Sequence, residues 1–278
     1  MNPEVQKNLR RGVYIVPTSL TVLNLFFGFT AIMLSLNATA AITGGDIAEA
    51  TRLFQRACWS LAIAAVFDTF DGFVARLMNA TSEFGKEYDS LADVVTFGAA
   101  PAVLVYAWAL NEWGRLGAGI AVLFLVGGSL RLARFNINTA KTDHRYFVGL
   151  PIPAGALTLA SIINYAPAPV RKLEFAAVML LVTAGLAFSM VSTVKYRSQK
   201  YASLQKERSF MYILLLAVIL VVVYRWPAEF FFIASVSYVM SGPLLKLWGI
   251  AFPSRRLPPS ETVIDPDLGT IKQQQIGS

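Results

Sequence analysis

The sequence predicts an all-α fold, a polytopic membrane helical bundle with about eight transmembrane helices. Three observations support this fold class. Apolar residues make up 55% of the 278 residues, and the mean hydropathy is +0.55. Charged residues make up only 15%, whereas a soluble chain carries about a quarter. The apolar residues also gather in runs long enough to cross a bilayer, so we expect one membrane-embedded domain over residues 13–250.

The expected membrane spans follow one another along the chain, separated by polar connections. They cover about residues 13–36, 53–77, 94–110, 116–135, 150–166, 175–194, 210–224 and 229–248. Residues 1–12 form a basic tail, and the apolar run after it is too long for a cleavable signal sequence. Residues 251–278 are polar and rich in proline and glutamine, so they are predicted to form a disordered tail.

The distribution of basic residues predicts how the bundle is oriented. Eighteen of the 24 Lys and Arg residues fall in the two tails and in the second, fourth and sixth connections. Cytoplasmic segments are enriched in Lys and Arg, so we expect both termini in the cytoplasm and the protein in the cell (inner) membrane. The net charge of +7 is spread between apolar runs rather than massed on one soluble segment, which argues against nucleic acid as a partner.

Four aspartates between residues 68 and 93 form the most informative pattern. Asp68 and Asp71 stand three residues apart, and Asp89 and Asp93 stand four apart, so each pair lies on one helix face. An unpaired carboxylate is costly inside a membrane, so four carboxylates in one gap between two helices need a compensating cation. Hard oxygen ligands suit Mg²⁺, Mn²⁺ or Ca²⁺, and two such ions could share Asp71 and Asp89.

The residues next to the aspartates suit a ligand that approaches the backbone closely. Gly72 and Ala75 share a helix quadrant with the first acid pair, and Arg76, one step round, would supply a fixed cation. Solvated loop acids or helix caps are the ordinary alternative, and the ion path of a cation transporter is a second one. An ion path does not require Gly72, Ala75, Arg76 and Gly85 in this register.

The first apolar run carries a polar strip on one helix face, formed by Thr18, Thr21, Asn24 and Gly28. Small and hydroxylated residues are common where membrane helices touch, so a packing seam is the simplest interpretation of this strip.

Basic residues close the fourth expected span. Arg131 and Arg134 anchor that end on the cytoplasmic side in the simplest interpretation, but their i, i+3 spacing also suits clamping a carboxylate or phosphate. Asn136 follows them and is not explained by anchoring. The next run, Phe-Val-Gly-Leu-Pro-Ile-Pro-Ala-Gly-Ala over residues 147–156, is by itself a kinked helix start.

The aspartate region resembles the signature of the CDP-alcohol phosphotransferases, which are integral membrane enzymes of phospholipid synthesis. The pattern D-x2-D-G-x2-A-R-x8-G-x3-D-x3-D is matched in full by Asp68, Asp71, Gly72, Ala75, Arg76, Gly85, Asp89 and Asp93. The resemblance implies that the four aspartates hold two divalent cations, Mg²⁺ or Mn²⁺, and that Asp93 is the general base. It also implies a homodimer formed through the membrane helices.

The resemblance further implies a CDP-diacylglycerol site on the same segment and on the first helix. Its expected residues are Thr21, Asn24, Gly72, Ala75, Arg76, Ser82 and Gly85. Thr18 stands where many relatives have Asn.

The run Arg131-x-x-Arg134-Phe-Asn136, followed by Gly-Leu-Pro-Ile-Pro-Ala, resembles one branch of the family. That branch transfers the phosphatidyl group from CDP-diacylglycerol to the hydroxyl of L-serine, giving phosphatidylserine and CMP. Arg131, Arg134 and Asn136 would then bind serine. The same chemistry with choline, inositol or glycerol phosphate as the acceptor is the alternative, because the aspartate motif recognises only the CDP-linked donor and not the acceptor. Choline has no carboxylate for two arginines to bind.

Overall fold

The computed structural model describes residues 3–78, 82–138, 146–192, 195–197 and 224–251. Its helices in chain order are α1 (Pro3–Thr43), α2 (Ile47–Leu77), α3 (Glu83–Asp93), α4 (Ala100–Trp108), α5 (Gly114–Asn138), α6 (Ile152–Tyr165), α7 (Leu173–Val191) and α9 (Pro227–Ala251). A π-helix, η1 (Val94–Ala99), joins α3 to α4, and a 3₁₀ helix, η2 (Leu110–Trp113), precedes α5. Two short strands, β1 (Tyr146–Val148) and β2 (Lys195–Arg197), pair antiparallel.

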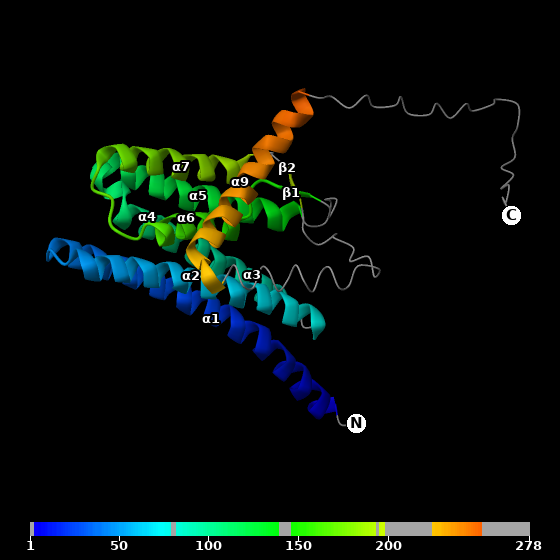
Figure 1. The fold of residues 1–278 in the computed structure, drawn as a ribbon. Helices are drawn as coiled ribbons and strands as arrows, with labels where there is room; N and C mark the ends of the chain where they lie inside the picture. The colour runs from blue at the N-terminus through cyan, green and yellow to red at the C-terminus, as the bar shows by residue number, and fades with distance from the viewer. Residues whose placement is uncertain (1–2, 79–81, 139–145, 193–194, 198–223, 252–278) are drawn as a thin grey trace, which may run out of the picture.

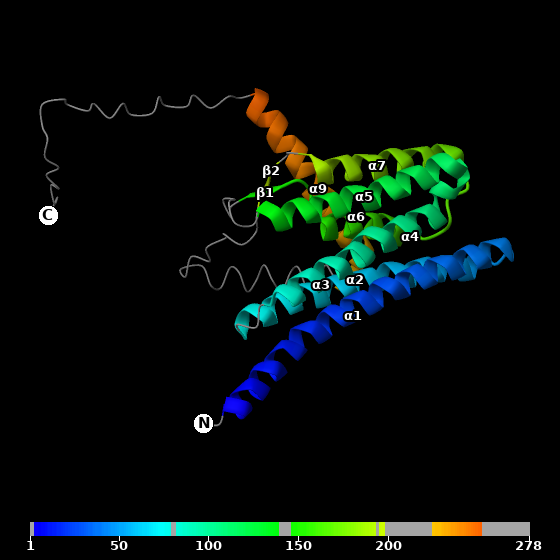
Figure 2. The same cartoon turned by 180° about the vertical axis from the view of Figure 1, so that it is seen from behind.

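The helices pack in two layers (Figure 1). α1 and α2 run antiparallel through a turn at Gly45, whose φ of +83° suits glycine, and they form the most extensive helix pair. α5, α6 and α7 form the other layer, and α9 packs across α6. Figure 2 shows α3 and α4 as one nearly continuous rod that lies along α1. The rod therefore places the second aspartate pair between the two layers.

The outward faces of the bundle are apolar and the interior is tightly packed. Phe54, Phe97 and Phe124 are fully buried, whereas Phe29 and Leu181 are among many large apolar side chains that remain exposed. In water such a surface would drive aggregation, but lipid tails solvate it. The composition and the surface agree on a membrane environment.

Five helical runs among the described residues are long and apolar enough to cross a membrane. They are Pro17–Thr43, Ile47–Leu77, Glu83–Trp108, Leu110–Ile137 and Leu173–Val191. α6 is apolar but has only 14 residues. α9 covers the expected eighth span, whereas the expected seventh, residues 210–224, lies almost wholly outside the described residues. The helical membrane bundle is thus confirmed, and the count of about eight spans is not.

The structure differs from the sequence prediction in two places that affect the site. The third span does not begin at residue 94: the helical run starts at Glu83, so Asp89 and Asp93 lie within it. The chain is also not helical throughout, because β1 pairs with β2, with Phe147 opposite Tyr196. This short ladder ties the chain before α6 to the chain after α7.

Candidate active site

Three carboxylates converge between α2 and α3. Oxygen atoms of Asp68, Asp71 and Asp89 all lie within 4.8 Å of one another, and Asp71 is only 5% exposed. Like charges this close repel strongly in a low-dielectric interior. One Asp89 carboxylate oxygen is also buried and finds no hydrogen-bond partner within the part of the chain that the structure describes. A cluster of hard oxygen donors with an unsatisfied buried atom fits a divalent cation such as Mg²⁺ or Mn²⁺.

Asp93 extends this cluster by one helical turn. It is 8% exposed, and its carboxyl group lies within hydrogen-bonding range of the Asp68 carboxyl. The structure therefore brings all four predicted aspartates together, with Asp93 beside the group of three rather than inside it.

Helix α1 contacts both acid pairs. The Thr21 hydroxyl lies 3.0 Å from Oδ2 of Asp71 and 3.2 Å from the backbone oxygen of Pro17. Its single proton can be donated to one acceptor at a time, and the carboxylate is the stronger acceptor. One turn further along, Nδ2 of Asn24 lies 3.5 Å from Oδ1 of Asp93. The polar strip of the first helix is thus turned toward the aspartates.

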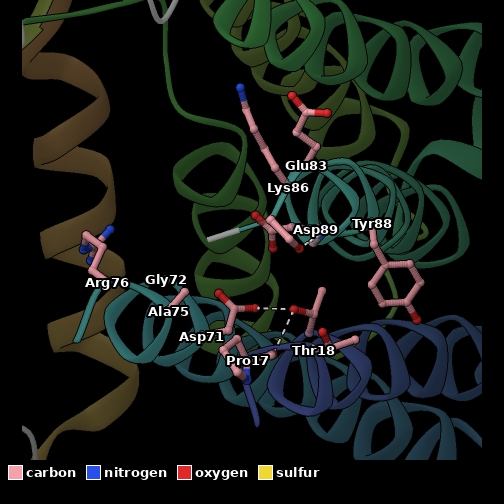
Figure 3. Close-up of a pocket in the computed structure, with 13 residues that line it drawn as sticks. Pro17, Thr18, Asp71, Gly72, Ala75, Arg76, Glu83, Lys86, Tyr88 and Asp89 are labelled. Carbon is pink, nitrogen blue, oxygen red and sulfur yellow. Dashed lines mark hydrogen bonds between the residues drawn. The ribbon is translucent and has the colours of Figure 1, made fainter. Parts of the chain in front are cut away.

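A pocket of about 490 Å³ opens beside the aspartates (Figure 3). This volume falls within the range of small-molecule and cofactor sites. Of the residues predicted for CDP-diacylglycerol and metal, the pocket wall contains Thr21, Asp71, Gly72, Ala75, Arg76, Ser82, Gly85 and Asp89. Asn24, Asp68 and Asp93 do not line the pocket, although Asp68 belongs to the carboxylate cluster that Asp71 and Asp89 share.

The α2 side of the pocket is smooth. A Cβ atom added to Gly72 would meet only Nη1 of Arg76, at 3.6 Å, so nothing else crowds this surface. In Figure 3, Gly72 and Ala75 follow Asp71 along the helix, and the exposed Arg76 stands at the edge of the pocket. A ligand can therefore lie flat against the α2 backbone while its charged part reaches Asp71.

The α3 side of the pocket begins at a helix N-terminus. Ser82 is the N-cap of α3, and its hydroxyl accepts a hydrogen bond of 2.9 Å from the backbone N–H of Gly85. N-caps of this kind satisfy an otherwise unpaired donor of the first turn. The positive end of the helix dipole thus faces the pocket, where it favours an anionic ligand.

The pocket wall also holds Glu83, Lys86 and Tyr88, which the sequence analysis did not single out. Pro17 and Thr18 line it too, and Thr18 belongs to the polar strip that the sequence predicted for the first helix. Lys86 stands three residues before Asp89, so helical spacing alone could have placed it on this face. Tyr88 stacks on Phe84, with ring centroids 6.0 Å apart, and the i, i+4 spacing of these two rings on one helix also indicates that contact.

The two arginines predicted for the acceptor differ in position. Arg131 is half-buried, lies within electrostatic range of Asp93 and the Tyr238 hydroxyl, and packs against the Phe135 ring at 5.5 Å. Arg134 is exposed. The Asn136 amide donates a 2.9 Å hydrogen bond to the Ser90 hydroxyl, which joins the end of α5 to α3. Only Arg131 of the pair therefore faces the aspartates.

The fold and the site together define a helical membrane protein with a carboxylate cluster on the wall of a ligand pocket. Residues 14–194, more than half of the chain, match the family described as CDP-alcohol phosphatidyltransferase. The chain belongs to this family, as the aspartate signature predicted. The protein is therefore an enzyme, a transferase of phospholipid synthesis.

Individual relatives point in the same direction. A CDP-diacylglycerol--serine O-phosphatidyltransferase of Helicobacter pylori is 34% identical over 194 residues, covering 68% of this chain and 74% of the relative. The protein of the same name from Bacillus subtilis is 39% identical over 129 residues, covering 46% of this chain and 67% of the relative. An archaetidylserine synthase of Methanothermobacter thermautotrophicus is 33% identical over 183 residues, covering 65% of this chain and 69% of the relative.

Proposed function

We propose that the protein transfers the phosphatidyl group of CDP-diacylglycerol to the hydroxyl of L-serine, giving phosphatidylserine and CMP. The observation that carries this proposal is the carboxylate cluster on the wall of a pocket with a smooth glycine- and alanine-lined side. The names of the bacterial relatives support serine as the acceptor. The archaeal relative's name supports the same acceptor with a different lipid.

The nucleotide end of the lipid would occupy the pocket. The open surface of Gly72 and Ala75 accommodates a flat ligand against α2, and Arg76 offers a cation at the pocket edge. The N-terminus of α3, capped by Ser82 and passing through Gly85, favours the negative diphosphate. The diacyl chains would remain among the lipids around the bundle.

Asp68, Asp71, Asp89 and Asp93 would hold divalent cations, Mg²⁺ or Mn²⁺, as a shared set of ligands. When bound, such ions neutralise diphosphate charge and polarise its oxygens. Thr21 supports this set from α1 by donating to the Asp71 carboxylate.

Asp93 would act as general base. Its carboxylate takes the proton of the serine hydroxyl as the serine oxygen forms a bond to the β-phosphorus of CDP-diacylglycerol. The bond between that phosphorus and the oxygen bridging to the α-phosphate breaks, and the electron pair leaves with CMP. Because Asp93 is only 8% exposed, little water reaches the base to compete with serine.

The acceptor would lie on the α5 side of Asp93. Of the two predicted arginines, Arg131 is the one within electrostatic range of that aspartate, so it is the better partner for the serine carboxylate, and the exposed Arg134 would assist. Asn136 borders the same region through its bond to Ser90. We also propose that this side, with both termini, faces the cytoplasm of the cell (inner) membrane and that the enzyme is a homodimer.

The first test is CMP release by purified protein from CDP-diacylglycerol with Mg²⁺ or Mn²⁺. L-serine, choline, inositol and glycerol 3-phosphate are supplied separately, and a chelator removes the metal in a parallel assay. We expect turnover with serine alone and loss of activity on chelation. Turnover with another acceptor would keep the transfer chemistry and reject serine. No CMP release with any acceptor, together with cation flux in vesicles, would favour a transporter.

The role of the arginines is tested by Arg131→Lys and Arg134→Lys. Lysine keeps the charge but cannot make a bidentate contact. We expect the KM for serine to rise by about tenfold in Arg131→Lys, less in Arg134→Lys, and the KM for CDP-diacylglycerol to change little in either. An unchanged serine KM in both variants would reject the assignment.

A further inference from the structure

Asn24 is the one predicted nucleotide contact whose surroundings suggest another role. Its side chain is fully buried and is absent from the pocket wall that contains Thr21, its neighbour one turn earlier. The side chain points instead to the second acid pair, where Nδ2 lies 3.5 Å from Oδ1 of Asp93. Asn24 therefore contacts the Asp93 carboxylate and does not line the ligand pocket.

The orientation of the Asn24 amide is set by this carboxylate. Only the NH₂ group can face Asp93, because the amide oxygen and the carboxylate would repel each other. The Asn24 Oδ1 atom is then buried and has no hydrogen-bond partner among the described residues. A buried oxygen without a partner lowers stability, so folding alone gives no reason for this amide.

The backbone of α1 is fixed at the same place. The Thr96 hydroxyl, which belongs to η1 and is fully buried, donates a 3.3 Å hydrogen bond to the backbone oxygen of Asn24. One turn further on, a Cβ atom added to Gly28 would lie 2.7 Å from Cα of Thr96, which is closer than real Cβ atoms approach. Gly28 thus allows α1 and η1 to touch, and this contact fixes the position of Asn24 along α1 relative to Asp93.

The π-helix adds a reason for such support. η1 begins immediately after Asp93, and π-helical turns are locally less regular than α-helix and occur often at functional sites. Asp93 is therefore the last residue of the α-helical part, and its carboxylate is contacted by the Asn24 amide and the Asp68 carboxyl group. The 3.5 Å separation is long for a hydrogen bond, as catalytic contacts often are before substrate binds.

We propose that Asn24 is a positioning residue that fixes the orientation of the Asp93 carboxylate for proton transfer. This role presupposes the transfer reaction proposed above. It differs from a nucleotide contact in a measurable way. A positioning residue acts on the rate of the chemical step, whereas a nucleotide contact acts on the binding of the CDP-lipid.

The test compares Asn24→Ala and Asn24→Ser with Ser35→Ala in the full chain. Ser35 is a matched control because it is buried on the same helix and, within the described residues, its hydroxyl donates only to its own turn, at the backbone oxygen of Ala31. Thermal unfolding in detergent reports the folded fraction, and kcat is expressed per folded enzyme. The serine variant is included because it leaves a smaller gap than alanine.

We expect kcat to fall about 10- to 100-fold in both Asn24 variants and to stay near wild type in Ser35→Ala. The KM for CDP-diacylglycerol should change less than about threefold. A raised KM with an unchanged kcat would overturn the proposal in favour of a nucleotide contact, and no change in either would reduce Asn24 to packing. If wild type uses another acceptor, the comparison is made with that acceptor. If wild type releases no CMP with any acceptor, the proposed function is rejected and this role with it.

Discussion

The α1–α3 side of the bundle and the α5–α7 side pack by different means. Between α1 and its neighbours, polar side chains reach from helix to helix: Thr21 contacts Asp71, and Asn24 contacts Asp93. Between α5 and α7 the backbones approach directly, since a Cβ atom at Gly127 would lie 2.9 Å from the backbone oxygen of Ala187. The buried Thr183 of α7 donates to its own helix.

The polar contacts on the α1–α3 side orient the carboxylates, whereas the close backbone packing on the α5–α7 side stabilises the bundle. Interhelical contact between small residues stabilises a membrane bundle through close packing and leaves no polar group to satisfy. Polar contacts that end on carboxylates bring charge into the bundle and cost stability unless they serve a ligand. We therefore expect substitutions on the α1–α3 side to lower activity and substitutions on the α5–α7 side to lower stability.

The largest expected effect is a loss of activity on the α1–α3 side, in the variant Asp93→Asn. Loss of a general base should lower kcat by about 1000-fold, equivalent to about 4 kcal/mol in the activation barrier, with the thermal unfolding midpoint unchanged or raised. Steady-state CMP release measures the rate. Glu112→Gln, an exposed acid outside the cluster, is the control and should retain wild-type activity. Comparable activity in both variants would remove Asp93 from the reaction.

The next effect is on stability, in Gly149→Ala. Gly149 has a φ of +82°, and an added Cβ would overlap the backbone oxygen of Met190 at the end of α7. We expect a loss of about 2–3 kcal/mol in the free energy of unfolding, with kcat per folded enzyme preserved. Gly119→Ala is the matched control, because nothing lies within 4 Å of its added Cβ and its φ is not positive. A stable Gly149→Ala variant would weaken the contrast between the two sides.

A smaller effect is expected for the Thr21 hydroxyl. Thr21→Val keeps the shape of the side chain and removes the donor to Asp71, so the Mn²⁺ concentration for half-activation should rise about tenfold. Thr39→Val is the control, because among the residues that the structure describes the Thr39 hydroxyl donates only to its own helix, at the backbone oxygen of Ser35. Equal metal dependence in the two variants would show that the α1 contact does not support the metal ligands.

The smallest effect should come from a neutral contact remote from the aspartates. The hydroxyls of Ser161 on α6 and Ser235 on α9 lie 2.6 Å apart. Interhelical bonds of this kind average about 0.6 kcal/mol in membranes, so Ser235→Ala should barely shift the unfolding midpoint and leave kcat unchanged. Ser241→Ala, which removes a bond within α9, sets the baseline. A large loss of activity in Ser235→Ala would extend the active site to α9.

The sequence predicted the family and the helical membrane bundle because both depend on local patterns. Aspartate spacing places Asp68 with Asp71 and Asp89 with Asp93 on single helix faces, and the structure brings these faces together. The third span was predicted to begin too late, because polar residues such as Lys86 lower the hydropathy of the first turns of that helix. Polar residues can continue a helix where they line a pocket instead of facing lipid.

Other features of the site depend on contacts between distant segments. Nothing in the residues 94–99 marks them as a π-helix, and the choice between Arg131 and Arg134 is made by how α5 packs. The separate positions of Thr21, which lines the pocket, and Asn24, which does not, also follow from helix packing. Their roles, like those of the other predicted site residues, stay predictions.

The hydrogen bond from Asn136 to Ser90 has a consequence for how new specificities arise. The aspartates and the pocket lie before residue 94, whereas the arginines expected to bind the acceptor come after residue 130. The turn at Leu110–Trp113 separates these two parts of the chain. Exchanging the later part between relatives is thus expected to change the alcohol that is modified while the donor half is inherited intact, provided that the Asn136–Ser90 pair is carried across with it.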